Sequence, residues 1–429
     1  MKTSYYNFIY PMKKDDTQFV VYNSFTNAMA LMDKNEIDYI TKGKEGLNAV
    51  NEDVKQTMVE NGFIVDDNID ELELIRERMF RCRYDDRQLG ITIAPTLDCN
   101  FRCVYCYEKE CEKGVLMSES VCKDLVEYVS CRVKDIHGLS VAWYGGEPLL
   151  AIKVIESLSK EFINICNENN ITYNAAIVTN GYLLDEQMIE RIMACNVSFA
   201  QITLDGDREG HNARRPHANG CDTFDTIIQN IIKASKKINV AVRVNVDKKN
   251  MDAAEKVEKI LNMDGQNSIL VYPAPIQNED GCYNQNECIG NEEFYRFKQS
   301  FYSTLKNKQF IMSQYPRLIG NSCCADNSAS LVVAPNGDLF KCWTDIGKKE
   351  YCIGNLSEKR FDVFKSIRYI KYDATRDEKC RDCKFLPICM GGCPRDVADK
   401  KADRCIHVSD VHRAYITQIA SVLNDVKEE

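Results

Sequence analysis

Cysteine constrains this chain more than any other residue type, because 21 of its 429 residues are cysteines and many of them stand in short groups. A secreted chain would use so many cysteines for disulfides. The total is odd, however, and the opening residues MKTSYYNFIYPMKKDDTQF hold no apolar stretch of signal-peptide length before their charges. These features indicate a cytoplasmic protein in a reducing compartment, where grouped thiols bind metal. We therefore expect cysteine-ligated clusters.

Composition narrows the possible partners. Hydrophobic residues make up 44% of the chain and charged residues 28%, which is ordinary for a globular protein. A chain of 429 residues exceeds the roughly 250–300 at which one core stops growing, so we expect two or three packed units. The formal charge of −9 has the wrong sign for binding a phosphate backbone. No apolar run of about 18 residues occurs. Neither nucleic acid nor a membrane is therefore an expected partner.

Residues 1–88 are expected to form a small α+β domain. They contain two β-rich runs, YNFIYPM and TQFVVYNS. Helix-like stretches follow around Asn27–Lys42 and Asp53–Asn61. The charged segment from Asp70 to Arg81 is predicted to be a helical connector.

Residues 89–315 repeat a pattern of strand, loop and helix. The predicted strands are residues 91–95, 139–144, 174–179, 198–204, 240–246 and 268–274. The predicted helices between them are Glu119–Asp135, Ile152–Asn167, Asp185–Met193, Phe224–Lys236 and Ala253–Leu261. Apolar strands joined by helical connections favour a parallel sheet, arranged as a closed or partly closed barrel.

Residues 316–429 lose this periodicity while their cysteine density rises. Nine of the 21 cysteines lie between Cys323 and Cys405. We expect this region to fold around metal rather than on a conventional core alone.

The first cysteine group lies directly after the first predicted strand. Cys99, Cys103 and Cys106 have the spacing C-x-x-x-C-x-x-C. Three thiolates on one loop can hold three irons of a [4Fe–4S] cube and leave the fourth iron open for a substrate. Two alternatives remain, namely an electron-transfer cluster completed by Cys111 and a zinc loop.

This triplet, with aromatic Tyr105 before its last cysteine, resembles the signature of the radical S-adenosylmethionine (SAM) superfamily. The resemblance implies an α/β fold with a partial (β/α)6 TIM-like barrel and a bound S-adenosylmethionine. Further family motifs follow successive strands, where a barrel places its active site. By the family pattern, the cofactor contacts are Tyr105, Gly145, Gly146, Glu147, Asn180, Asp205, Thr223 and Arg243.

Six of these contacts have an expected role. The two glycines let backbone approach the ligand, and Glu147 offers a carboxylate to the methionine ammonium. Asp205 faces the ribose hydroxyls, whereas Thr223 and Arg243 lie near the ligand carboxylate. Each motif alone is weak evidence, because a Gly-Gly pair usually only forms a turn and an arginine in a strand usually contacts solvent or a structural acidic residue. The interpretation depends on the order of these motifs along the chain and on their common position after the strands.

The tail is similar, cysteine by cysteine, to the SPASM domain, which carries two auxiliary [4Fe–4S] clusters in peptide-modifying members of the superfamily. Without that context, a zinc ribbon would be as reasonable an interpretation. Together with the first cluster, the resemblance implies three [4Fe–4S] clusters. The outer cluster would be held by Cys380, Cys383, Cys389 and Cys405, and the inner one by Cys324, Cys342 and Cys393.

The fourth ligand of the inner cluster stays open. Some relatives supply a thiolate six residues after the first tail cysteine, where this chain has Ser330. Cys323 or Cys352 is one possibility, although two adjacent cysteines on one cube are sterically awkward. An upstream cysteine, Cys282 or Cys288, is another, and an iron left open for substrate is the third.

The N-terminal domain resembles, more loosely, the winged-helix-like peptide-recognition domain of enzymes that mature ribosomally made peptides. Such a domain would hold the leader of a precursor peptide by adding it as a strand to a sheet edge. A packing extension of the barrel is the alternative.

The resemblance also implies a reaction. Ferredoxin or flavodoxin would reduce the first cluster, and cleavage of S-adenosylmethionine would give a 5′-deoxyadenosyl radical that removes hydrogen from the peptide. We expect a thioether crosslink as the product, as in sactisynthases and ranthipeptide synthases.

The sequence does not identify a catalytic residue. Two other functions are alternatives to crosslink formation. Anaerobic sulfatase maturation is one, but those relatives have an aspartate directly after the second tail cysteine, where this chain has Trp343, with Asp345 two places on. A non-catalytic electron carrier or peptide-binding module is the other.

Overall fold

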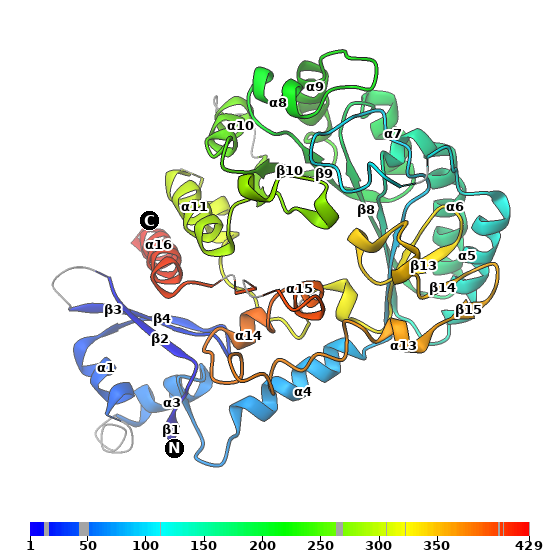
Figure 1. The fold of residues 1–429 in the computed structure, drawn as a ribbon. Helices are drawn as coiled ribbons and strands as arrows, with labels where there is room; N and C mark the ends of the chain where they lie inside the picture. The colour runs from blue at the N-terminus through cyan, green and yellow to red at the C-terminus, as the bar shows by residue number, and fades with distance from the viewer. Residues whose placement is uncertain are drawn as a thin grey trace. The chain divides into compact units, whose positions relative to one another are not determined.

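The computed structural model describes the chain except residues 13–16, 43–50, 112, 263–268, 306, 322, 402–403, 406 and 429. The chain forms two compact units (Figure 1). The first contains Met1–Tyr84, Asn291–Cys323 and Lys371–Glu429, and the second contains Asp85–Gly290 and Cys324–Ile370. The cysteine-rich tail therefore contributes to both units. None of the described helices combines the length and apolar character that a membrane span needs.

A ten-stranded sheet forms the centre of the second unit, in the order β11-β10-β9-β8-β7-β6-β12-β13-β14-β15. Its six parallel strands confirm the six predicted ones. They are β6 (Gln88–Ile93), β7 (Gly138–Trp143), β8 (Thr172–Thr179), β9 (Val197–Thr203), β10 (Asn239–Val246) and β11 (Leu270–Pro275). Each pairs with the next in parallel register, so their carboxyl ends share one edge. This is the partial barrel of the α/β class that the sequence predicts.

Helices cover the outer face of this sheet (Figure 1). Their starts follow from capping, because Ser118, Asp185 and Asp207 accept hydrogen bonds from the first-turn N–H groups. The α-helices are α5 (Glu119–Arg132), α6 (Ile152–Glu168), α7 (Glu186–Ala194), α8 (Arg208–Arg214), α9 (Phe224–Ala234) and α10 (Ala253–Asn262). All five predicted helices are confirmed, and α8 was not predicted. Short 3-10 turns are η1 (Pro148–Ala151), η2 (Glu279–Gly281) and η3 (Gln285–Glu287).

Four short tail strands extend the sheet beyond β6. Strand β12 (Ser330–Val333) pairs in parallel with β6, and Ser330 lies opposite Gly90. Strands β13 (Asp338–Phe340), β14 (Gly354–Asn355) and β15 (Arg360–Phe361) continue it in antiparallel order. The connections hold η4 (Cys324–Asp326), η5 (Trp343–Asp345), η6 (Lys349–Tyr351) and α13 (Val363–Ser366). This part of the tail rests on the apolar core of the barrel, through Val332, Ala334 and Phe340.

The N-terminal part of the first unit is α+β, as predicted. Strands β2 (Asn7–Pro11), β3 (Gln18–Asn23) and β4 (Met29–Asp33) form an antiparallel sheet, and β1 (Lys2–Thr3) pairs with β5 (Ile64–Val65). The helices are α1 (Lys34–Thr41), α3 (Glu52–Glu60) and α4 (Glu71–Arg83).

One predicted helix in this region was partly wrong. The helix expected over Asn27–Lys42 is a strand over Met29–Asp33 and a helix only from Lys34. Cross-strand pairing with β3 outweighs the helix propensity of Met, Ala and Leu. A capping box between Asp33 and Glu36 then fixes where the helix begins.

The rest of the first unit comes from the second half of the chain. It contains α11 (Asn291–Thr304), α12 (Lys308–Met312), α14 (Leu386–Cys389), α15 (Pro394–Ala398) and α16 (Ser409–Glu428). Ile416 and Ala420 of α16 pack with Phe8, Val20 and Tyr22 of the N-terminal sheet. The tail thus has a conventional apolar core as well, which the loss of periodicity did not predict.

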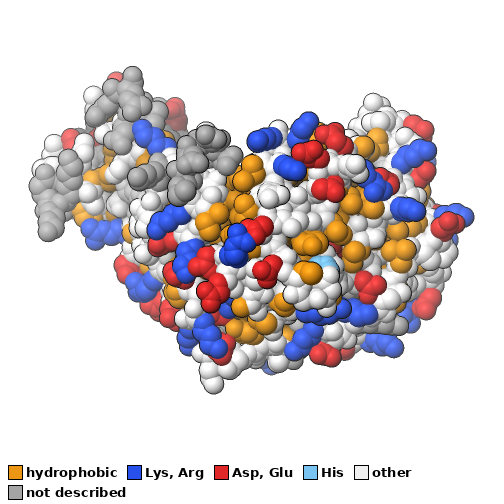
Figure 2. All heavy atoms as spheres, turned by 90° about the horizontal axis from the view of Figure 1, so that it is seen from above, with side chains coloured by type: hydrophobic (Ala, Val, Ile, Leu, Met, Phe, Trp, Pro, Cys, Tyr) orange, Lys and Arg blue, Asp and Glu red, His pale blue; other side chains and the backbone are white. Residues whose placement is uncertain are grey.

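Charged side chains of both signs are interspersed over the described part of the face in Figure 2.

The turn after β7 packs against the chain that follows β6. The N–H of Gly146 donates to the Thr96 carbonyl (3.3 Å), and the N–H of Glu147 donates to the Asp98 carbonyl (2.8 Å). A Cβ on Gly145 would lie 2.4 Å from the Thr96 oxygen, and one on Gly146 would lie 2.2 Å from the Asp98 oxygen. Only glycine permits this approach, and it positions the segment that leads into Cys99.

We expect Gly146→Ala to displace this segment and to lower the free energy of unfolding by about 1–3 kcal/mol through overpacking. Guanidinium unfolding under anaerobic conditions measures the effect. Gly114→Ala is the control, because a Cβ on Gly114 meets nothing within 4 Å and adds only the strain of its φ of +79°. Equal losses in the two variants would contradict the proposed clash.

The first unit should lose stability as the pH falls. Burial, reinforced by neighbouring His407, lowers the pKa of His412 to about 3. Below about pH 6.5 the imidazole of His412 binds a proton in the unfolded chain but not in the folded chain. The free energy of unfolding therefore decreases by about 1.4 kcal/mol for each further pH unit. His412→Gln should remove about 1 kcal/mol of the difference in unfolding free energy between pH 7 and 5.5. An unchanged difference in denaturant titrations would exclude this role.

Candidate cofactor site at the carboxyl ends of the barrel strands

Three thiols lie together on the loop that follows β6. The Cys106 N–H donates to the Cys103 carbonyl (3.2 Å), and the Phe101 N–H donates to the Cys99 sulfur (3.4 Å). Burial, together with neighbouring Cys103, raises the pKa of Cys99 to about 12 and that of Cys106 to about 11. Thiols with such raised pKa values suit a cationic metal centre, which deprotonates its ligands. The donor set therefore fits an iron–sulfur cluster.

Cys111, the alternative fourth ligand, is directed elsewhere. Its thiol lies 3.6 Å from the Ile346 carbonyl, and its side chain packs against the cluster that includes Leu97 and Ile346. Cys282 is nearer the loop, with its sulfur 3.7 Å from the Tyr105 carbonyl. The part of the chain that the structure describes contains no group of three His, Cys, Asp or Glu side chains spaced for a single metal ion.

Tyr105 joins the thiol loop to the ends of β9 and β10. Its hydroxyl donates to the Asp205 carboxylate and accepts from Arg215 Nη1 (2.7 Å) and Asn245 Nδ2 (2.9 Å). Asp205 is 1% exposed, and its other oxygen accepts from the Asn245 N–H (3.0 Å). Burial alone lowers the pKa of the Arg215 guanidinium, but Cys103, Tyr105 and Asp205 outweigh it and raise that pKa. A permanent cation therefore lies beside Cys103.

Glu147 is fully buried at the same edge of the sheet. Its carboxylate accepts hydrogen bonds from the Leu149 N–H (3.0 Å), the Thr179 hydroxyl (2.8 Å) and the Asn180 N–H (2.8 Å). Burial raises its pKa, and these hydrogen bonds oppose that shift. The Asn180 amide in turn donates to Asn100 Oδ1 (2.7 Å), next to Cys99. Glu147 and Asn180 are thus brought together with the thiol loop.

Thr223 is linked to Asp205 through His211, and Arg243 is linked to Tyr105 through Asn245. Asp205 N–H donates to His211 Nδ1 (3.2 Å), so His211 Nε2 carries the proton and donates to the Thr223 hydroxyl (3.1 Å). Thr223 is fully buried and also contacts the Arg215 carbonyl (3.2 Å). Arg243 donates to Asn245 Oδ1 (2.8 Å).

The site contains charged residues that were not predicted from the sequence. Arg214 pairs with buried Asp247 (2.9 Å), and its guanidinium lies 5.6 Å from the Tyr105 ring centre. The Tyr283 hydroxyl also donates to Asp247 (2.6 Å). Two consecutive arginines in NARRPH, shortly after the fourth predicted strand, were the available signal for Arg214 and Arg215.

An aromatic bridge connects the thiol loop to the tail within the second unit. Tyr107 follows Cys106, and its hydroxyl is hydrogen-bonded to that of Tyr144. The Tyr144 ring lies 4.6 Å from that of Trp343, which follows Cys342. Burial raises the pKa of Tyr144, and the thiols of Cys106 and Cys342 both add to that shift.

The four cysteines of the predicted outer set all lie in the first unit. Burial, together with the neighbouring thiols of Cys380, Cys383 and Cys405, raises the pKa of Cys389 to about 12. Of the predicted inner set, Cys393 belongs to the first unit, whereas Cys324 and Cys342 belong to the second. Cys352 donates to the Gly354 carbonyl (3.1 Å).

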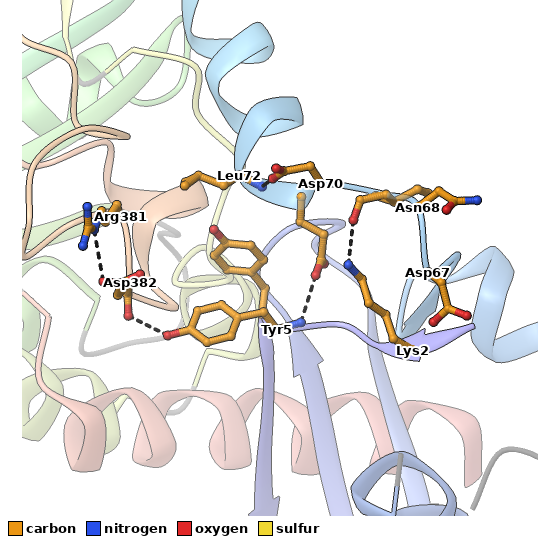
Figure 3. A pocket seen from close by; sticks show the side chains of 11 residues that line it. Lys2, Tyr5, Asp67, Asn68, Asp70, Leu72, Arg381 and Asp382 are labelled. Carbon is orange, nitrogen blue, oxygen red and sulfur yellow. Dashed lines mark hydrogen bonds and ion pairs between the residues drawn. The ribbon is translucent and has the colours of Figure 1, made fainter. Parts of the chain in front are cut away.

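A cavity of about 490 Å³ adjoins the loop between the first two outer cysteines (Figure 3). Arg381 and Asp382 of that loop form part of its wall. The Tyr5 hydroxyl donates to the Asp382 carbonyl (2.6 Å), and the Tyr5 N–H donates to Glu71 (3.0 Å). These hydrogen bonds attach the segment between β1 and β2 to the cysteine loop and to α4, and we assign the cavity no ligand.

Sequence comparisons identify two domains. Residues 93–261 match the Radical SAM superfamily, and residues 323–384 match SPASM, an iron–sulfur cluster-binding domain. The chain is 27% identical over 337 residues to a cysteine-type anaerobic sulfatase-maturating enzyme of Clostridium novyi, a match that covers 72% of this chain and 89% of the relative. It is 24% identical over 353 residues to a serine-type enzyme of Bacteroides thetaiotaomicron, covering 71% and 82%.

Solved structures share the fold. The structure of anSMEcpe with bound AdoMet has a TM-score of 0.61 at 19% identity and covers 80% of this chain and 96% of that chain. Streptococcus suis SuiB bound to its precursor peptide SuiA has a TM-score of 0.55 at 15% identity and covers 95% and 99%. The two domain matches therefore show that this chain carries a radical SAM domain followed by a SPASM iron–sulfur cluster-binding domain.

Proposed function

We propose that this radical SAM enzyme forms a thioether or a related crosslink in a ribosomally made precursor peptide. One observation carries the proposal: three half-buried cysteines share a loop at the carboxyl ends of the strands, and the Cys111 thiol contacts the Ile346 carbonyl instead. Cys99, Cys103 and Cys106 would hold three irons of a [4Fe–4S] cluster, which would leave the fourth iron for S-adenosylmethionine. When bound, the reduced cluster and S-adenosylmethionine supply a 5′-deoxyadenosyl radical that removes hydrogen from the peptide.

The chain's own residues would bind and orient the cofactor. Gly145, Gly146 and Glu147 shape the turn beside Cys99, and Asn180 fixes Asn100 in the same loop. Asp205, through Tyr105, Asn245 and Arg215, holds the other side of the loop. Arg215 and Arg243 supply positive charge near a ligand carboxylate, with Thr223 supporting the backbone of Arg215. We propose these residues as the S-adenosylmethionine pocket.

A thioether product requires an electron acceptor. Joining an S–H and a C–H group removes two hydrogens, of which one leaves with the radical and the other leaves as a proton and an electron. The outer and inner cysteine sets would hold two auxiliary [4Fe–4S] clusters that take this electron. The bridge of Tyr107, Tyr144 and Trp343 supports such transfer, because it runs from Cys106 to Cys342.

The N-terminal α+β part of the first unit would bind the leader of the precursor peptide. Its antiparallel sheet has β2 and β4 at its edges, and an added peptide strand can pair with such an edge. The alignment with SuiB, which is bound to a precursor peptide, covers 95% of this chain, whereas that with anSMEcpe covers 80%. This difference favours a peptide-binding role over a packing extension.

Formylglycine formation, as in sulfatase maturation, is the second candidate. The relatives named as sulfatase-maturating enzymes favour it. The residue after Cys342 is Trp343, whose ring packs on Tyr144. The nearby Asp345 is 1% exposed and accepts the Tyr369 hydroxyl (2.6 Å), so it has no access to a substrate. These contacts favour crosslink formation.

We expect Cys103→Ala to abolish cleavage of S-adenosylmethionine, because it removes a thiolate from the three-ligand cluster. Cys383→Ala should retain part of the cleavage and stop product formation, because it removes only an outer ligand. The measurement is 5′-deoxyadenosine after anaerobic reconstitution and dithionite reduction, together with iron per chain. Exposed Cys131→Ala is the matched control. Equal loss of cleavage in the two ligand variants would mean that the cluster roles are misassigned. A fully loaded wild-type protein that makes none would favour a non-catalytic carrier.

The two candidate products differ in mass. Each short cysteine-containing peptide found in the neighbouring open reading frames is incubated with the enzyme, and the substrate should lose two hydrogens, located by fragmentation at a cysteine and a partner residue. A sulfatase-type peptide should remain unchanged. Formation of an aldehyde with loss of the cysteine sulfur would instead establish formylglycine chemistry.

A further inference from the structure

The side chain of Tyr372 contacts a cysteine of the proposed outer cluster. The Tyr372 hydroxyl oxygen lies 3.5 Å from the sulfur of Cys380, which is a hydrogen-bond distance for sulfur. A cysteine that binds iron has lost its S–H proton and can only accept a hydrogen bond. With a cluster bound to Cys380, the Tyr372 hydroxyl is therefore the donor. The sequence did not predict this residue as part of the cluster site.

The ring of Tyr372 packs against two further segments that carry outer cysteines. The guanidinium of Arg404, which directly precedes Cys405, lies 5.4 Å from the ring centre. Gly391 follows Cys389 by two residues, and a Cβ on Gly391 would lie 2.8 Å from the Tyr372 oxygen. Glycine at this position therefore leaves room for the hydroxyl. These contacts fix the hydroxyl among the outer ligands.

The acidic neighbour of Cys380 is compensated within the same unit. The Asp377 carboxylate contacts the Cys380 sulfur and accepts the Cys380 N–H (3.2 Å). Arg404 Nη2 donates to that carboxylate (2.5 Å). The negative charge of Asp377 is thus paired, and the Tyr372 hydroxyl supplies a neutral donor to the same sulfur.

Two other outer sulfurs accept hydrogen bonds from the backbone. The Cys383 sulfur accepts from the Phe385 N–H, and the Cys389 sulfur accepts from the Gly391 N–H. The hydrogen bond to Cys380 comes from a side chain instead. A substitution can therefore remove it while the backbone around the cluster stays the same.

We infer that Tyr372 raises the reduction potential of the outer cluster through its hydrogen bond to Cys380, which makes that cluster a better electron acceptor. The inference rests on the proposed function, in which crosslink formation releases one electron. A reduced cluster has one more negative charge, part of which lies on the cysteine sulfurs. The hydrogen bond therefore stabilises the reduced form more than the oxidised form. The cluster gains the electron that the peptide loses, while Tyr372 keeps its proton.

The experiment compares the reconstituted full-length chain with Tyr372→Phe, which removes one oxygen and keeps the ring. Tyr5→Phe is the matched control, because the Tyr5 hydroxyl donates to the Asp382 carbonyl of the same cysteine loop and not to a sulfur (Figure 3). A redox titration followed by electron paramagnetic resonance measures the cluster potentials, and iron per chain is measured alongside. The outer cluster is identified as the signal that Cys383→Ala lacks.

We expect Tyr372→Phe to hold as much iron as the wild-type chain. At a fixed potential, its ratio of reduced to oxidised outer cluster should fall at least about threefold, because one hydrogen bond to the reduced form is lost. Electron–nuclear double resonance in D2O should show an exchangeable deuteron beside the outer cluster of the wild-type chain that is missing from this variant. Tyr5→Phe should match the wild-type chain in every measurement.

An unchanged potential in fully loaded Tyr372→Phe would overturn the inference, and so would an equal decrease in Tyr5→Phe. Loss of iron from Tyr372→Phe alone would also overturn it, because Tyr372 would then have a structural role. Failure of the proposed function has a different signature. Without crosslinking chemistry the difference in potential would remain, and without an outer cluster the titrations of the wild-type chain and Cys383→Ala would be identical.

Discussion

The close contact between the turn after β7 and the chain after β6 is the constraint on which the rest of the site depends. At Gly145 and Gly146 the turn lies so close to the backbone after β6 that a Cβ on either glycine would overlap it. The same turn places the Glu147 carboxylate between the strands β7 and β8, where it binds Thr179 and Asn180. Asn180 then fixes Asn100 beside Cys99. One turn thus sets the position of a thiol and of the polar groups around it.

Charge balance is the second constraint on this site. Asp205 and Glu147 are almost completely buried, and each accepts several hydrogen bonds. Arg215 is the buried cation among them, next to Cys103. Removing one partner of such a set leaves an uncompensated buried charge, which costs about 3–5 kcal/mol. Burial is the main cause of the raised pKa values of the thiols, so they do not ionise readily without a metal. A cationic metal centre would supply the positive charge that stabilises their thiolate form.

The sequence predicted the barrel well because its strands are apolar runs separated by amphipathic helices, and each signal is local. It predicted the thiol loop and the positions of Glu147, Asn180 and Asp205 because they follow strand ends. It did not predict that Met29–Asp33 forms a strand, since pairing with β3 is a tertiary interaction. Nor did it predict β12 beside β6, because residues so far apart in the chain leave no shared periodicity. Arg215 was missed for the same reason, since its partners lie on two other segments, the thiol loop and the end of β9.

The aromatic bridge shows how local sequence and tertiary packing combine. Tyr107 directly follows one cysteine of the thiol loop, Trp343 directly follows Cys342, and Tyr144 directly precedes the Gly145–Gly146 turn. Each aromatic residue is therefore fixed by a neighbour that the site already constrains. Packing β12 against β6 then brings the three rings into sequence, without any further motif. The electron route that we propose would need no separate scaffold, because the backbone contacts that position the thiols also position these three rings.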